Sequence, residues 1–318
     1  MPRVTLFAPE LCHAMETVAY FLEMGGAQVR FATNPADGDL VREHPWSLRR
    51  IQQYGGIEVF EYFGKPQSSD ILIFFLVQYG RVSDKFRQWR KCARSVAYMS
   101  SRVGRMTQRE WAREVVRSFP HYFGARRISF FPYVHPELLL HPQWRERLLG
   151  SFDANAEREH RICFVGCTQP PERAVRLEQC RRALAGAEKK TYWLDYGGVE
   201  TRKGPTGLDP MQYLDVLSNT DFCISPPGWG DQYTHRTIEA IIRGSIPIIE
   251  DPERYELEFR DHENCIIATA TDWGAAVRAT LDISEREVQR MRRNVLALRA
   301  DRLLPQKAID RFNSQLLA

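Results

Sequence analysis

Residues 222–251, FCISPPGWGDQYTHRTIEAIIRGSIPIIED, decide the fold of this chain. The stretch begins with the apolar run 222–224 and is interrupted by proline and glycine at 226–230, after which apolar residues recur with helical spacing up to Ile242. Gly244 is suited to the left-handed position that follows a helix, and the apolar run 246–249 comes directly after it. The pattern predicts strand, loop, helix and strand, which is a unit of a parallel α/β sheet.

The loop and the start of the predicted helix form a candidate anion site. Free backbone N–H groups and the positive end of the helix dipole meet at such a point. Arg236, in the first turns of the helix, can reach the same anion, and Glu239 can accept from a sugar hydroxyl. His235 is a further candidate. These residues suit a nucleotide-sugar diphosphate, although Arg236 and Glu239 can also form an ordinary ion pair on one helix face.

The motifs FC-x-SP-x-GWG, T-x-R-x-x-EA and GSIPI resemble the donor-binding signature of exostosin-like glycosyltransferases. The resemblance covers residues 211–282 and elsewhere concerns only the architecture. It implies the GT-B fold, with two doubly wound Rossmann-like α/β domains that face a cleft and C-terminal helices that pack back on the first domain. Pro227 departs from the family, which has a basic or small residue there, and Thr234 replaces a common serine. The implied donor-binding residues are Ser225, Pro226, Gly228, Trp229, Gly230, Thr234, His235, Arg236 and Glu239.

Apolar runs along the chain predict two α/β domains. We expect an N-terminal acceptor-binding domain at 1–145, a linker at 146–160, a nucleotide-sugar-binding domain at 161–283 and two helices at 284–318. Expected strands lie at 4–8, 28–33, 57–62, 70–77, 95–99, 128–133, 161–166, 192–196, 222–224, 246–249 and 264–268. Besides the helix that carries Arg236, expected helices lie at 15–24, 83–93, 107–116, 171–184, 211–218 and 273–281.

Two further sites follow from the expected fold. Gly166 opens the turn before the helix that carries Arg173, and in the resembled fold this turn lies beside the donor phosphates. A plain turn with a surface arginine is the alternative. An inverting transfer needs a base for the acceptor hydroxyl, and His13 and Glu10 follow the first strand, where some inverting GT-B enzymes place a histidine. That role is an analogy from the fold, and a polar helix N-terminus is the alternative.

A metal-binding motif is the weaker interpretation of residues 37–39. Asp-Gly-Asp matches the Asp-x-Asp pattern of metal-dependent glycosyltransferases, but the neighbouring proline and glycine predict a turn. We therefore expect no metal and no cofactor. The helix dipole and Arg236 would stabilise the leaving diphosphate.

Composition indicates a globular protein, with 43% hydrophobic and 26% charged residues and a formal net charge of +4, which does not suggest nucleic-acid binding. No apolar run reaches the roughly 20 residues that span a bilayer, and the N-terminus lacks a signal-peptide pattern. Seven cysteines without paired spacing predict reduced thiols, so we expect a cytoplasmic location. Basic residues at 85–94, interleaved with Phe86 and Trp89, and at 286–293 leave open a peripheral contact with the inner face of a membrane.

The sequence thus predicts an inverting, metal-independent glycosyltransferase of polysaccharide biosynthesis. It would move a hexosyl or pentosyl group from a nucleotide sugar, expected to be a UDP-sugar, to a glycan or lipid-linked glycan. Two alternatives stay open: a nucleotide-sugar epimerase or hydrolase of the same fold, and a non-catalytic carbohydrate-binding subunit of an assembly.

Overall fold

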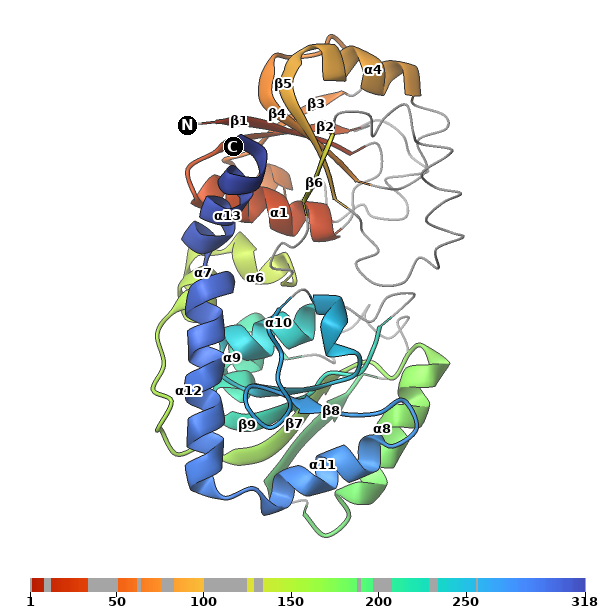
Figure 1. Ribbon diagram of the computed structural model, residues 1–318, viewed down its shortest axis with the longest axis vertical. Coiled ribbons are helices and arrows are strands. Elements are labelled where there is room, and N and C mark those ends of the chain that lie inside the picture. The colour runs from red at the N-terminus through yellow and green to blue at the C-terminus, as the bar shows by residue number, and fades with distance from the viewer. Residues whose placement is uncertain are drawn as a thin grey trace. The chain divides into compact units, whose positions relative to one another are not determined.

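The computed structural model describes residues 2–8, 13–33, 51–61, 64–75, 83–99, 125–128, 134–187, 190–196, 208–228, 234–255 and 257–317. The chain divides into two compact units (Figure 1): unit 1 comprises Met1–His141 and Pro305–Ala318, and unit 2 comprises Pro142–Leu304. Residues 146–160, expected to form a linker, therefore lie within unit 2, where α7 (Pro142–Leu149) begins the unit. Within the described part of the chain, no helix is long and apolar enough to cross a membrane.

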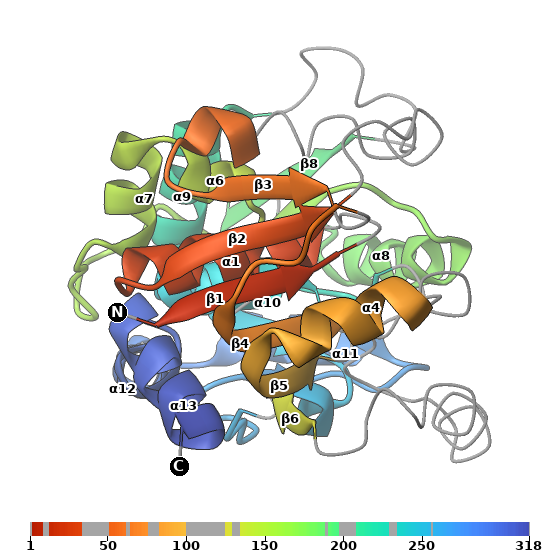
Figure 2. The ribbon, with the colours of Figure 1, turned by 90° about the horizontal axis from the view of Figure 1, so that it is seen from above.

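Unit 1 is built on a six-stranded sheet with the order β3-β2-β1-β4-β5-β6, in which all neighbours are parallel. Figure 2 shows the strands β3, β2, β1 and β4 side by side. This is the strand order of the Rossmann fold, so the expected doubly wound architecture is confirmed for unit 1. The strands are β1 (Arg3–Phe7), β2 (Gln28–Thr33), β3 (Glu58–Glu61), β4 (Ser69–Phe75), β5 (Ala93–Met99) and β6 (Arg126–Ile128).

The helices of unit 1 whose bounds the structure describes are α1 (His13–Met24), α4 (Ser83–Lys91), α6 (Glu137–Leu140) and α13 (Pro305–Leu317), and helices cover both faces of the first sheet (Figure 1). Helices α1 and α13 pack together against one face, and α4 lies against the other. Phe86 and Trp89 of α4 are buried in a core cluster with Phe7, Leu72 and Phe74. The aromatic residues that the sequence places among the basic side chains of α4 therefore belong to the core and are not available to enter a membrane.

Unit 2 is built on a five-stranded sheet with the order β11-β10-β9-β7-β8, again with parallel neighbours. Counted from β7 as its first strand, the order is that of flavodoxin-like doubly wound sheets. The strands are β7 (His160–Gly166), β8 (Thr191–Asp195), β9 (Thr220–Ile224), β10 (Ile246–Ile249) and β11 (Ile266–Ile267). The helices are α7, α8 (Pro171–Ala183), α9 (Pro210–Ser218), α10 (His235–Ile242), α11 (Trp273–Asp282) and α12 (Glu285–Arg302), with a 3-10 turn at Pro252–Tyr255. The expected helix at 107–116 and the strand residues 129–133 lie outside the described residues.

Helix α10 ends in a Schellman motif at Gly244. Gly244 has φ +76°, as predicted for a left-handed C-terminal residue, and its N–H donates to the carbonyl of Ile241 at 3.0 Å. The N–H of Ser245 donates to the carbonyl of Ala240 at 2.8 Å. The chain therefore turns directly from α10 into β10, which fixes how the helix lies on the sheet.

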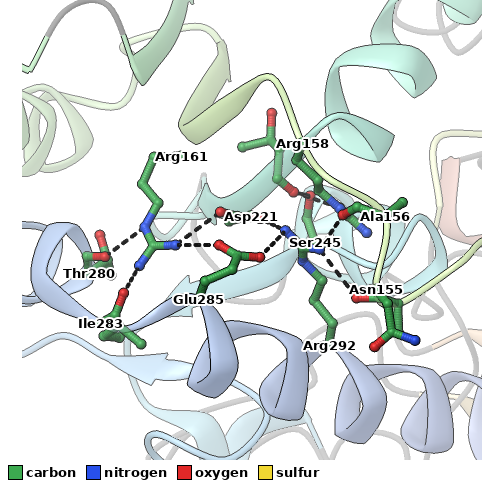
Figure 3. A network of polar contacts seen from close by, with 12 residues as sticks. Asn155, Ala156, Arg158, Arg161, Asp221, Ser245, Thr280, Ile283, Glu285 and Arg292 are labelled. Carbon is green, nitrogen blue, oxygen red and sulfur yellow. Dashed lines mark hydrogen bonds and ion pairs between the residues drawn. The ribbon is translucent and has the colours of Figure 1, made fainter.

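The two C-terminal helices belong to different units. Helix α13 packs on α1 of unit 1, as the expected architecture requires, whereas α12 packs on α10 and β10 of unit 2. A buried ionic network joins α12 to the sheet (Figure 3): Arg292 of α12 pairs with Asp221 of β9, and Arg161 Nη1 of β7 donates to the same carboxylate at 3.1 Å. Burial lowers the pKa of Arg292 to about 9, so its guanidinium group remains charged at neutral pH.

Candidate functional site

The candidate site lies at the carboxyl ends of β7 and β9, the neighbouring strands between which the winding of unit 2 reverses direction. Strand β7 ends at Gly166, and β9 ends at Ile224, from which the chain continues through residues 225–228 toward α10. Ligands of open α/β sheets bind outside the carboxyl ends of the strands at this reversal. Those sequence-predicted residues of unit 2 that the structure describes therefore lie near the position where the fold favours a ligand.

Arg236 lies over Gly166. Its guanidinium carbon is 5.0 Å from the centroid of the Phe164 ring, and a Cβ atom on Gly166 would be only 1.9 Å from Nη2 of Arg236. The side chain is buried, and among the described residues neither Nε nor Nη1 has a hydrogen-bond partner. A buried charge without a partner is costly. An anionic ligand at this point would supply the missing acceptors and the opposite charge.

The carboxylate of Glu239 faces the interior of the protein. The hydroxyl of Tyr213 on α9 donates to Oε2 of Glu239 at 2.5 Å, and Nδ1 of His235 lies 3.0 and 3.1 Å from the two carboxylate oxygens. Glu239 is 0% exposed, whereas the side chain of His235 is 32% exposed. Burial and the neighbouring Glu239 raise the pKa of Tyr213 well above its ordinary value, so the phenol stays a donor. Direct contact of Glu239 with a sugar hydroxyl would require this cluster to rearrange.

Arg173 ties the two loops of the site together. Its Nε donates to the carbonyl of Pro227 at 2.9 Å, and its Nη1 donates to the carbonyl of Cys167 at 3.4 Å. The side chain is 7% exposed, so Arg173 is not the surface arginine of the alternative interpretation, and it is not an open phosphate ligand either. The contact uses the backbone of residue 227 and does not explain why proline stands there.

The loop after β9 and the start of α10 complete the site. Ser225 is buried, and its N–H donates to the carbonyl of Ile248 at 3.0 Å, while Pro226 is buried and Gly228 is half-buried. Thr234 occupies the N-cap position of α10, but its side chain makes no capping hydrogen bond; its hydroxyl lies 3.2 Å from that of Thr237. Thr234 therefore does not occupy the N–H groups of the first helical turn with its own side chain.

Several predicted residues fall outside the part of the chain that the structure describes: Glu10, Trp229, Gly230 and the Asp-Gly-Asp turn at 37–39. His13 is the first residue of α1, and its side chain also lies outside the described residues. The assignment of a catalytic base therefore remains a prediction. Within the described ranges, no group of three or more His, Cys, Asp or Glu side chains could hold a metal ion.

Sequence reasoning missed Tyr213 as a member of the site. A tyrosine on an amphipathic helix is usually a core residue, and its partner Glu239 lies on another helix. The sequence signal that could have pointed to Tyr213 is the position of Glu239 in the apolar helix 235–242. A carboxylate buried in such a helix needs a hydrogen-bond donor from a neighbouring element.

Comparison with known proteins agrees with the resemblance to exostosin-like glycosyltransferases. No family model matches the chain. Two Arabidopsis thaliana proteins described as probable xyloglucan galactosyltransferases are each 26% identical to this chain. One aligns over 159 residues, which are 48% of this chain and 25% of that protein. The other aligns over 136 residues, which are 42% of this chain and 26% of that protein. A xyloglucan-specific galacturonosyltransferase of the same plant is 21% identical over 257 residues, 70% of this chain and 36% of that protein. The chain thus spans between 25% and 36% of the length of these relatives.

Solved structures share the fold along nearly the whole chain. Sucrose-phosphate synthase from Thermosynechococcus elongatus aligns with a TM-score of 0.54 at 12% identity and covers 99% of this chain and 98% of its own. A UDP-forming trehalose-phosphate synthase from Burkholderia vietnamiensis gives 0.53 at 10% identity, with coverages of 99% and 97%. The N-terminal domain of a trehalose-6-phosphate phosphatase from Candida albicans gives 0.57 at 7% identity, with coverages of 98% and 97%. The chain has the GT-B fold, and at these identities the likeness extends to the fold alone.

Proposed function

We propose that this chain is a glycosyltransferase whose second unit binds a nucleotide-sugar donor. The observation that carries the proposal is the buried guanidinium group of Arg236. Arg236 belongs to the first turn of α10, and its guanidinium group lies over Gly166 at the end of β7. Its Nε and Nη1 atoms have no hydrogen-bond partner among the described residues. A diphosphate provides the acceptor oxygens and the charge that this group needs. The names of the curated relatives support the reaction class.

In the proposed reaction, a hydroxyl group of the acceptor attacks the anomeric carbon of the donor sugar. The bond from that carbon to the diphosphate oxygen breaks, and the hydroxyl proton passes to a base, for which His13 and Glu10 are the candidates. Arg236 and the first turn of α10 stabilise the charge that develops on the diphosphate, and in the proposed reaction no step uses a metal. Single displacement would invert the anomeric configuration.

The proposed donor is a UDP-sugar that carries a hexosyl or pentosyl group. The relatives' names refer to galactosyl and galacturonosyl transfer, which favours a hexosyl donor. The proposed acceptor is a glycan or lipid-linked glycan. Because Phe86 and Trp89 are buried, any contact of α4 with an anionic membrane would rely on charge alone, for example through Arg87 and Lys91, and would weaken with salt.

Calorimetry with UDP, GDP and CDP tests the donor site. We expect wild type to bind one of them, and Arg236→Ala to bind it about 10- to 100-fold more weakly, the size expected for hydrogen bonds between charged groups. Arg182→Ala is the matched control, because Arg182 is 78% exposed and pairs with Glu178 on its own helix. Absence of nucleotide binding, or equal binding by Arg236→Ala, would refute the proposal.

Product analysis separates the alternatives. Release of UDP that depends on a glycan acceptor is expected for a transferase. Turnover of the donor without any acceptor would favour an epimerase or hydrolase. Tight glycan binding together with no nucleotide affinity would favour a non-catalytic subunit.

A further inference from the structure

The start of α10 is held by a tyrosine from another part of unit 2. Thr234 occupies the N-cap position of α10, but its side chain makes no capping hydrogen bond. Its hydroxyl lies 3.2 Å from the hydroxyl of Thr237, which in turn lies 3.0 Å from the hydroxyl of Tyr255. Tyr255 is the last residue of the 3-10 turn that follows β10. Three hydroxyl groups therefore join the loop after β10 to the first turn of α10.

Tyr255 and Thr237 are both buried beneath the surface of unit 2. Tyr255 is 1% exposed and Thr237 is 0% exposed. Burial raises the pKa of Tyr255 to about 12, while its hydrogen bonds with Thr237 and Thr234 act in the opposite direction. The phenol therefore keeps its proton at neutral pH and remains both a donor and an acceptor. Because neither side chain offers surface to a ligand, any effect of the two hydroxyl groups on binding must pass through a neighbouring residue.

The loop that carries Tyr255 is itself anchored to other elements. At its start, the carboxylate of Glu250 accepts from the guanidinium group of Arg176 on α8 at 2.8 and 3.0 Å. The same carboxylate accepts from Nε1 of Trp273, the first residue of α11, at 3.0 Å. At its end, the ring of Tyr255 meets the ring of Phe259 edge-on, with 5.3 Å between the centroids. The loop after β10 is therefore fixed against α8 and α11 and can serve as a support for α10.

Arg236 lies between the two threonines that this contact holds. Its buried guanidinium group extends to the end of β7, where it lies over Gly166 and 5.0 Å from the centroid of the Phe164 ring. Arginine has a long, flexible side chain. The position of the guanidinium group therefore depends on how the first turn of α10 is held.

We propose that Tyr255 is a positioning residue that acts through Arg236: it holds the first turn of α10 so that the guanidinium group lies over the end of β7. The expected effect on nucleotide affinity rests on the proposed function, whereas the effect on the position of Arg236 does not. The loop after β10 thereby prepares the candidate site, although Tyr255 itself is buried.

UDP affinities of single variants test the contact between Tyr255 and Thr237. Tyr255→Phe and Thr237→Val each remove one hydroxyl and nearly keep the shape of the side chain. We expect each to bind UDP about fivefold more weakly than wild type, the size of one neutral hydrogen bond. Thr237→Ser keeps the hydroxyl and should bind like wild type, as should Tyr192→Phe on β8, the matched control for the loss of a phenolic hydroxyl. Wild-type affinity in Tyr255→Phe, or an equal loss in Thr237→Ser and Thr237→Val, would overturn the inference.

A double-mutant cycle tests whether Tyr255 acts through Arg236. UDP binding is measured for wild type, Tyr255→Phe, Arg236→Ala and the double variant. Once Arg236 is absent, the loss of the Tyr255 hydroxyl should cost little further affinity, because the group that it positions has been removed. A full additional loss of about fivefold in the double variant would show that Tyr255 influences the nucleotide by another route and would overturn the inference.

NMR of arginine-labelled, ligand-free protein tests the positioning without any nucleotide. The Nε–H resonance of Arg236, assigned by its loss in Arg236→Ala, should be shifted in wild type by the neighbouring ring of Phe164. In Tyr255→Phe it should move toward the resonances of exposed arginines such as Arg182, whereas in Tyr192→Phe it should stay in place. An unchanged resonance in Tyr255→Phe would overturn the inference. If the resonance moves as expected but wild type binds no nucleotide, the proposed donor site fails while the positioning of Arg236 by Tyr255 stands.

Discussion

The guanidinium group of Arg236 occupies the space that a side chain at position 166 would need, since a Cβ atom there would lie 1.9 Å from Nη2 and 2.9 Å from Cζ. The two residues come from different elements, the end of β7 and the start of α10, which meet where the winding of the sheet reverses. A side chain at the end of β7 would collide with Arg236, which is far away in the sequence, and this explains sterically why position 166 is a glycine. The pair defines the candidate site more sharply than either residue alone.

Gly166→Ala should displace Arg236 and weaken UDP binding at least about tenfold, comparable to Arg236→Ala, because the guanidinium group can no longer lie over the end of β7. Calorimetry measures the affinity. Gly186→Ala is the control: Gly186 has φ +87° and open space around it, so alanine should cost about 1 kcal/mol of stability and leave UDP binding unchanged. Wild-type affinity in Gly166→Ala would contradict the steric argument.

Arg173→Ala should lower the free energy of unfolding by about 2 kcal/mol, because two carbonyl groups lose a buried charged donor and the loops after β7 and β9 lose their connection. Urea denaturation gives the value. Arg182→Ala on the same helix is again the control and should change stability by less than about 0.5 kcal/mol. Equal stabilities of the two variants would mean that Arg173 does not hold the loops.

Periodicity in the sequence was sufficient to predict the elements but not their contacts. The strands at 28–33 and 246–249 were predicted with the bounds that the structure has, since each is a short β-rich run between clear turn residues. The pattern of α10 showed that Arg236 and Glu239 lie near one face of a helix, but not that α9 would place Tyr213 against Glu239. Likewise, the buried position of Arg173 depends on β7 and β9 being neighbours, which follows from strand order and not from local sequence.

Asp221→Asn should destabilise unit 2 by about 3 to 5 kcal/mol, because Arg292 and Arg161 would lose the buried carboxylate that both contact (Figure 3). Thermal and urea unfolding measure the loss. Asp301→Asn is a matched control, since Asp301 pairs with Arg302 at the surface and is 69% exposed, and it should be nearly neutral. A loss below about 1 kcal/mol for Asp221→Asn would show that backbone carbonyls satisfy the arginines without the carboxylate.

Stability should fall as the pH rises above about 9, where an unfolded thiol ionises. Burial raises the pKa values of Cys180 and Cys265 to about 12, so the folded state keeps protons that the unfolded state has lost. Each such thiol contributes stability that is fully present below the unfolded pKa and declines by about 1.4 kcal/mol per pH unit as the pH rises toward the folded pKa. Cys180→Ala should therefore reduce the slope of unfolding free energy against pH, measured by urea denaturation from about pH 8 to about pH 11. Cys92→Ala, which removes an exposed thiol, is the control variant. Equal slopes for Cys180→Ala and wild type would show that the Cys180 thiol ionises in the folded state as readily as in the unfolded chain.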